Sequence, residues 1–372
     1  MNINPKRLLE ARLTMGYTQE ELGIFINKSK SVISKWETGK HQPDPESALQ
    51  IADALNLPLS WFSRTYFDSD NGVYQYRSNA KATKFLQAAT KGRLKWLKEM
   101  VEILEEWVEF PELNLPCTPN RIQALNLTDD DIEYYAHQLR ICWGLGDSPI
   151  LDLIGVAETN GVIITKELIN GDNMDGVSSW FNGRPYVWLA SNKINYYRSR
   201  FDLAHELGHI ILHRNLTHDD CDKKRYPELE RQANLFASHF LLPRKPLSLD
   251  YRAITLENLL IPKKHWGASV AALIMQYHNL GIIDDDYKSR LFKNYSYRKW
   301  RKNEPFDDKT LPEKPSLMKN TIMLLIEHGG FNKQNIVDYL GYYDKQIEPL
   351  CSLPRGFFNT KTSTRPQLRF VE

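Results

Sequence analysis

The spacing of apolar residues predicts a chain built mainly from helices, with a short group of strands near its middle. Residues 5–65 hold several short segments with a helical apolar period, separated by glycine and by Ser or Thr residues that suit helix N-caps. Residues 161–165, 177–181 and 185–190 are typical of strands, and Asn182-Gly183 suits a two-residue hairpin turn between the last two. A helical period then returns over most of the remaining chain.

We therefore expect a multidomain protein that is mainly α, with one α+β part. An all-α domain is predicted over residues 1–66, followed by a linker and a long amphipathic helix over 67–127. An α+β domain is predicted over 128–246. A helical extension over 247–304 and a small helical unit with a basic tail over 305–372 complete the expected order.

Four segments of the chain carry less specific patterns. Residues 66–80 and 305–315 are typical of linkers. The apolar side of the helix within 81–108 has an irregular repeat, which favours burial within the chain over the alternative, a seam in a homodimer. Segment 288–302 combines Lys and Arg with aromatic residues and no acid. We interpret it as a solvated helix flank with aromatic packing, and a nucleic-acid or partner surface is the alternative.

The N-terminal pattern contains a recognisable series of motifs. The runs T-Q-E-E-L, S-x-S-V-I-S-K-W-E-x-G and L-x-I-A-x-A-L follow one another within about sixty residues, with a proline between the last two. This series resembles the Cro/C1-type (XRE) helix-turn-helix domain of phage repressors. The resemblance implies an all-α domain that binds double-stranded DNA and places its second motif helix in the major groove.

Position in that fold suggests which side chains would contact DNA. Gln19 would lie near the backbone or the first base, and the residues expected to face base edges are Lys30, Ser31, Ser34 and Lys35. Residues 28–40 hold four lysines and one glutamate, so phosphate contacts would supply much of the affinity. The alternative is a small helical domain whose lysines are merely solvated.

The most specific chemical motif is His205-Glu206-Leu207-Gly208-His209, which reads H-E-x-x-H inside a helical pattern. Residues four apart share one face of a helix, so His205 and His209 can bind one zinc ion. Glu206 can then act as the general base toward zinc-bound water. A zinc hydrolase needs a third protein ligand. The residues alone leave several candidates, which are His213, His218, Asp219, Asp220, Glu228 and Glu230.

A second resemblance narrows that choice. The run R-x-R-F-D-L-A-H-E-L-G-H-I-I-L-H, followed by E-x-x-A-N-x-F-A-x-x-F-L-L-P, is similar to the ImmA/IrrE family of zinc metallopeptidases. The resemblance implies a zincin-like domain with Glu230 as the third zinc ligand and Glu206 as the general base. Asn234 could orient Glu230 or serve in packing. His239 replaces an acidic residue that is common in the family, and it receives no role.

Composition limits the compartments and partners. The net charge is only +2, so nucleic-acid binding must depend on a local patch. The four cysteines are far apart and form no C-x-x-C motif, which argues against a thiolate zinc site or a disulfide framework and suggests the reducing cytoplasm. No run of 18 apolar residues occurs, so no membrane span is expected.

These observations predict a DNA-binding transcriptional regulator that carries a zinc-dependent endopeptidase. Its substrate would be a specific protein, such as a repressor or another regulator. The alternative is a non-catalytic DNA-binding repressor or antitoxin with a structural or regulatory zinc site. An intact Glu206 favours the enzyme, because a purely structural zinc site does not require that residue.

Overall fold

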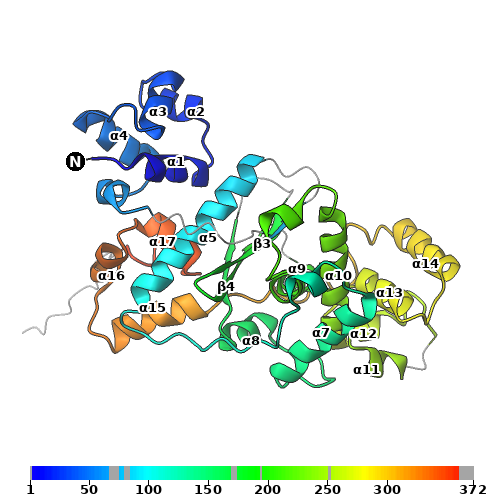
Figure 1. Cartoon of the computed structure of the whole chain (residues 1–372). Helices are drawn as coiled ribbons and strands as arrows, with labels where there is room; N and C mark the ends of the chain where they lie inside the picture. The colour runs from blue at the N-terminus through cyan, green and yellow to red at the C-terminus, as the bar shows by residue number, and fades with distance from the viewer. Residues whose placement is uncertain are drawn as a thin grey trace, which may run out of the picture. The chain divides into compact units, whose positions relative to one another are not determined.

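The computed structural model describes residues 2–66, 75–78, 84–168, 174–192, 195–249 and 253–359. The chain forms two compact units, and each is assembled from segments that are distant in sequence. The first unit consists of Met1–Tyr66, Glu99–Val108 and Met318–Glu372. The second consists of Phe67–Lys98 and Glu109–Leu317. The division between the units falls within the helix α5 (Lys84–Leu104), which is labelled in Figure 1, because Lys98 belongs to the second unit and Glu99 to the first.

The first unit begins with five short helices: α1 (Pro5–Thr14), α2 (Gln19–Phe25), α3 (Lys30–Glu37), α4 (Pro45–Leu55) and the 3-10 helix η1 (Leu59–Ser63). The predicted caps form, because Thr18 and Glu21 make a capping box on α2 and the Ser29 side chain caps α3. The core of these helices is apolar. Its completely buried members include Leu8, Leu22, Ile33, Ile51 and Leu55.

Three helices from the end of the chain complete this unit: α15 (Leu317–Glu327), α16 (Lys333–Leu340) and α17 (Asp344–Leu350). They contact the N-terminal residues directly. The Trp61 and Tyr342 rings lie 6.1 Å apart, and Arg64 donates a hydrogen bond to the Leu340 carbonyl. The Tyr342 hydroxyl donates to Glu99, which comes from the end of α5. Residues 1–66 are therefore packed against the C-terminal helices rather than folded alone.

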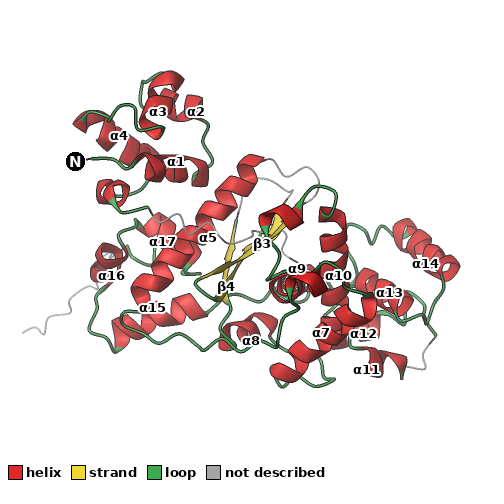
Figure 2. Ribbon diagram, in the orientation of Figure 1, coloured by secondary structure: helices red, strands yellow, loops and turns green. Residues whose placement is uncertain are grey.

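The second unit holds a four-stranded sheet of β1 (Gln75–Ser78), β2 (Ile163–Glu167), β3 (Met174–Phe181) and β4 (Arg184–Ala190), in the order β1-β3-β4-β2. Strands β3 and β4 form an antiparallel hairpin (Figure 2). Asn182 and Gly183 make its turn with positive φ angles of 48° and 79°, as the Asn-Gly pair predicts. Strand β2 pairs parallel to β4, and β1 pairs antiparallel to β3.

Helices pack against this sheet in an apolar core that includes residues of β2 and β4. Two long helices, α9 (Tyr196–Leu212) and α10 (Tyr226–Leu241), pack closely against each other. The other helices of the unit are α6 (Arg121–Ala124), α7 (Asp129–Cys142), α8 (Leu153–Thr159), η2 (His218–Cys221), α11 (Arg244–Ser248), α12 (Leu260–Trp266), α13 (Val270–Asn279) and α14 (Asp285–Tyr297). No helix in the described ranges combines the length and the apolar character needed to cross a membrane.

One of the two linker predictions needs correction. The segment 66–80 contains β1, because a short stretch within its polar sequence pairs with the edge of the sheet. The connection 305–315 has no helix or strand, yet it is tied to the second unit by buried charges. Completely buried Lys263 donates to Glu304 and Asp307 at 2.7 and 2.5 Å. Unpaired burial of these charges would be costly, so the pairs fix the path of the chain here.

The basic and aromatic segment 288–302 lies mostly on α14 and the turn after it. Tyr295 is buried, and Phe292 and Trp300 pack against the same core. Arg298 pairs with Glu257, and Lys288 pairs with Asp285. Three of the four aromatic residues of this segment therefore serve in packing, whereas Tyr297 is exposed.

Candidate metal centre

The H-E-x-x-H sequence lies within α9, and the predicted third ligand lies within α10. The Asn195 side chain caps the first turn of α9. Gly208 permits the close approach of the two helices, because a Cβ atom at this position would lie 3.1 Å from the Cα of Ala233. The absence of a side chain at Gly208 thus brings the facing residues of α9 and α10 within reach of a common ligand.

Three side chains converge between the helices. The Nε2 atoms of His205 and His209 lie 3.0 Å apart. Glu230 places Oε1 3.2 Å from Nε2 of His209 and Oε2 3.5 Å from Nε2 of His205. Ligand atoms bound to zinc at roughly 2.0–2.1 Å in a tetrahedron lie about 3.3 Å apart, so the three side chains fit such an ion. Within the described part of the chain, this is the one His, Cys, Asp and Glu group that could hold a metal.

The hydrogen-bonding partners of His209 fix which ring nitrogen faces the cluster. The carboxylate of Glu228 can only accept, so the 3.1 Å contact orients Gln232 with Nε2 toward Glu228 and Oε1 toward His213. Nε2 of His213 then donates to Gln232, which leaves Nδ1 of His213 to accept from Nδ1 of His209 at 2.8 Å. Nε2 of His209 therefore carries the lone pair that a metal requires.

Burial keeps His213 neutral in this chain of hydrogen bonds. Burial and the adjacent His209 together lower the pKa of His213 to about 3. A neutral imidazole has one donor and one acceptor, which is what the positions between Gln232 and His209 require. The sequence left His213 among the open candidates for the third zinc ligand. The structure shows that it binds His209 directly.

His205 is oriented from the other helix. Its Nδ1 lies 3.0 Å from Oδ1 of Asn234, so Nδ1 donates and Nε2 is left for a metal. Sequence analysis offered Asn234 either as a partner of Glu230 or as a packing residue. The prediction that Asn234 orients Glu230 is wrong. Asn234 lies one turn after Glu230 on α10, and its amide oxygen contacts His205 on α9 instead.

The substitution His213→Phe should weaken zinc binding about 10–100-fold, because it removes the acceptor that holds His209 in the metal-binding tautomer. The affinity is measured by competition with a chromogenic zinc chelator. The matched control is His218→Phe, since His218 is exposed on η2. Equal zinc affinities for the two variants would show that the His209 tautomer does not depend on His213.

Glu206 occupies a completely buried position between α9 and the sheet. The Ser178 hydroxyl of β3 donates to its Oε2 at 2.6 Å. The backbone of Gly176 lies against the same carboxylate, because a Cβ there would be 2.7 Å from Oε1. Neither residue is predicted from the sequence, because neither belongs to a motif. Their position in a strand does not indicate a contact with Glu206, which lies 28 residues after Ser178 and 30 after Gly176.

The rival ligands of the sequence analysis lie elsewhere. Asp220 accepts hydrogen bonds from Arg121 at 2.6 and 2.7 Å and caps η2, and Glu228 pairs with Arg231. His218 and Asp219 are exposed on η2. Of the candidate acids, Glu230 is the one that the structure brings to both imidazoles.

Comparison with known protein families agrees with this arrangement. Residues 157–275 match the M78 peptidase family model, described as the IrrE N-terminal-like domain, and residues 8–62 match a helix-turn-helix family model. The chain therefore joins a helix-turn-helix domain to an IrrE N-terminal-like domain. A search of curated proteins found no matching relative. The first match covers β2 to α13, including the metal cluster, and neither match includes β1.

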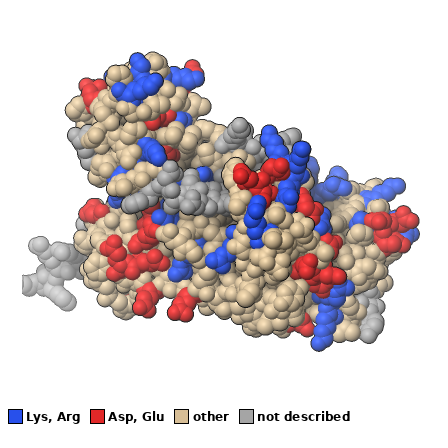
Figure 3. Space-filling model, viewed as in Figure 1, with Lys and Arg blue, Asp and Glu red and all other residues tan. Residues whose placement is uncertain are grey.

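The helix-turn-helix domain presents the predicted contact residues on α3 and at the start of α2. Lys30, Ser31 and Lys35 are exposed, and Ser34 is half-buried. Basic side chains gather over this end of the first unit (Figure 3). The Gln19 side chain donates to Glu37 at 2.7 Å, and Glu37 also pairs with Arg12 in the core.

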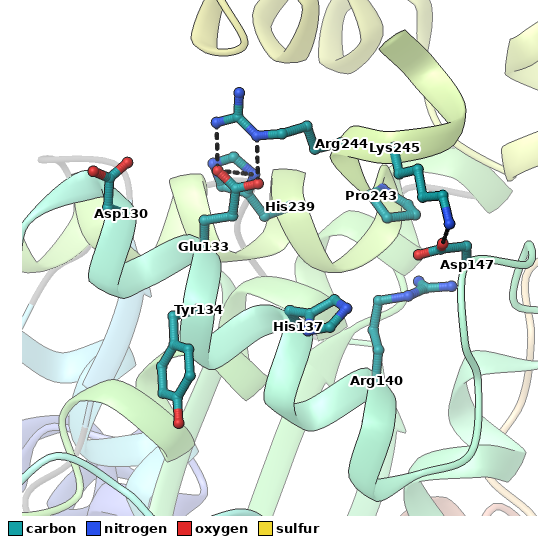
Figure 4. Close-up of a pocket in the computed structure, with 10 residues that line it drawn as sticks. All are labelled: Asp130, Glu133, Tyr134, His137, Arg140, Asp147, His239, Pro243, Arg244 and Lys245. Atoms are coloured by element: carbon teal, nitrogen blue, oxygen red, sulfur yellow. Dashed lines mark hydrogen bonds and ion pairs between the residues drawn. The ribbon is translucent and has the colours of Figure 1, made fainter. Parts of the chain in front are cut away.

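A separate polar cavity of about 760 Å³ lies between α7, the end of α10 and α11 (Figure 4). It shares no residue with the metal cluster. Its charged groups pair with one another, as Glu133 does with Arg244 and Asp147 does with Lys245. His239, which had no assigned role, lines this cavity and contacts Gln276.

Proposed function

We propose that the chain is a DNA-binding transcriptional regulator whose IrrE N-terminal-like domain is a zinc-dependent endopeptidase. Its substrate would be a protein, such as a repressor or another regulator. One observation carries the proposal: His205, His209 and Glu230 converge with their ligand atoms 3.0–3.5 Å apart, and Glu206 follows His205 on α9, the helix that carries both histidines. This is the combination of three ligands and one free carboxylate that a catalytic zinc site needs.

The side chains of this site divide the chemistry between them. A bound zinc ion would supply a Lewis acid that makes water more acidic and polarises a peptide carbonyl. Glu206 would accept the proton of the attacking water and return it to the departing amine. Ser178 holds one oxygen of Glu206, which keeps the carboxylate in a single orientation. The two hydrogen-bonded imidazoles keep their Nε2 lone pairs directed at the same point.

Removal of the metal tests the peptidase. The zinc-loaded chain should produce new protein termini in a cell extract, detected by mass spectrometry, because a hydrolase breaks peptide bonds wherever it recognises a substrate. 1,10-phenanthroline should abolish these termini, and added zinc should restore them. A chain that binds one zinc ion and yields no zinc-dependent termini would instead support the non-catalytic repressor with a structural zinc site.

Charge removal on α3 tests the DNA interface. The double variant Lys30→Gln, Lys35→Gln should bind a random-sequence DNA duplex more weakly. The slope of log affinity against log salt should become shallower by about 0.9 for each lost phosphate contact. The control is Lys319→Gln, Lys345→Gln, which removes the same charge from exposed positions of the same unit. Equal slopes for the two double variants would place the DNA interface elsewhere.

A further inference from the structure

The strand β1 extends the sheet at the edge beside the metal centre. It is the terminal strand of the order β1-β3-β4-β2, so β3 would be an edge strand without it. It runs antiparallel to β3, with Gln75 opposite Ser178 and Arg77 opposite Gly176. It comes from the connection between η1 and α5, outside both segments that match known families. The domain that carries the metal cluster is therefore covered by a strand that is not part of the family match.

The β3 residues paired with β1 are the ones that contact the proposed base. Gly176 and Ser178 both touch the Glu206 carboxylate. Neighbouring strands lie about 4.8 Å apart, so the backbone of Gln75 to Arg77 runs one strand spacing from these contacts. β1 also contacts α9, the helix that carries Glu206. β1 thus occupies the edge of β3 to which an extended substrate would have to add in order to lie beside Glu206.

The pairing stops at a defined point. The register shifts between Arg77 and Ser78, where the pairing passes from Gly176 to Met174 of β3. Asp175 is held by two hydrogen bonds of 3.0 and 2.9 Å from Arg198 in the first turn of α9. Such a bulge bends an edge strand and limits the length of chain that can add to it. The edge of β3 therefore offers a short stretch of backbone, and β1 occupies it.

An endopeptidase must hold its substrate in an extended form, and addition to a sheet edge is the simplest way to do so. The opposite edge of the sheet is β2, which is separated from β3 by β4. The described sheet contacts of Glu206 are with β3. In the same structure Glu206 and His205 are completely buried. A substrate strand and β1 would compete for one set of β3 backbone groups.

We propose that β1 is a built-in competitor, and that a protein substrate binds as an extended strand on β3 only after β1 has left. The role of β1 in regulation rests on the proposed peptidase function. Competition between β1 and another extended segment for the edge of β3 does not require that function. It predicts that the substrate class is an extended, unpaired polypeptide segment. It also predicts that the resting chain binds such segments weakly.

Peptide binding tests the competition without requiring cleavage. All proteins carry Glu206→Gln, and the probe is a fluorescein-labelled peptide of residues 71–82, followed by anisotropy. Two adjacent prolines, Tyr76→Pro and Arg77→Pro, remove the ability of β1 to pair. The control places the two prolines at Asp70 and Asn71, outside the bounds of β1. If β1 is docked at least nine-tenths of the time, the β1 variant should bind the probe at least tenfold more tightly than the parent and the control.

Hydrogen exchange gives a second measurement. The β3 amides that point away from β4 should exchange at least tenfold faster in the β1 variant than in the control. Equal peptide affinities, or unchanged β3 exchange, would overturn the proposal even if the chain proves to be a peptidase. Tight peptide binding by the β1 variant would support it even if no protein is ever cleaved. Cleavage of the active chain within residues 67–83 would also overturn it, since β1 would then be a substrate and not a lasting competitor.

Discussion

The substitution Glu206→Gln should abolish proteolysis while leaving zinc in place. Glutamine keeps the size of the side chain and the contact with Ser178, but it cannot accept a proton at neutral pH. General acid–base groups contribute about 10²–10⁴-fold to rate, so cleavage should fall by at least that range. The measurement pairs the rate of appearance of new termini with the zinc content of the same sample.

Ser178→Ala provides a graded comparison for this loss. It removes the 2.6 Å hydrogen bond but leaves the carboxylate, so its rate should lie between those of the parent and Glu206→Gln. Zinc content should be equal in all three proteins, because neither side chain belongs to the ligand cluster. Cleavage that persists in Glu206→Gln would require another base and would remove the main support for a zinc peptidase.

The substitution Glu230→Gln should deprive the chain of its metal. The change removes the one negative charge among the three ligands. The loss in zinc affinity should exceed the roughly 10–100-fold that partners outside the ligand set contribute. Because a metal that binds only the folded state stabilises it, zinc should raise the melting temperature of the parent but not of the variant.

Glu228→Gln is the matched control for Glu230→Gln. Glu228 lies two residues earlier on the same helix and pairs with Arg231 outside the cluster. Its glutamine still offers an oxygen that can accept from the Gln232 amide, as the carboxylate does at 3.1 Å. A control that loses zinc as completely as Glu230→Gln would make Glu228, which was an open candidate from sequence, the third ligand.

The sequence was most informative where structure depends on neighbours along the chain. The capping box of Thr18, the Asn182-Gly183 turn and the helix that carries His205 and His209 all follow from local spacing. The position of Glu230 opposite two imidazoles depends on the packing of α9 against α10, and only the family resemblance indicated it beforehand.

The features that sequence analysis missed depend on distant partners. β1 was hidden in a polar connection, because four residues give no clear strand period and its partner strand lies about a hundred residues later. The connection 305–315 has the pattern of a linker, and no local pattern shows that Lys263 and Arg200 are buried against Glu304, Asp307 and Glu313. The link between Asn234 and His205 likewise required the geometry of two helices.

The interleaving of the first unit has a consequence for any cut in the chain. Trp61 packs against Tyr342, and Arg64 donates a hydrogen bond to the Leu340 carbonyl. A break of the chain between residue 66 and α5 would therefore leave the N-terminal fragment noncovalently bound to the C-terminal helices. Nicking would therefore not liberate the DNA-reading part as a free product.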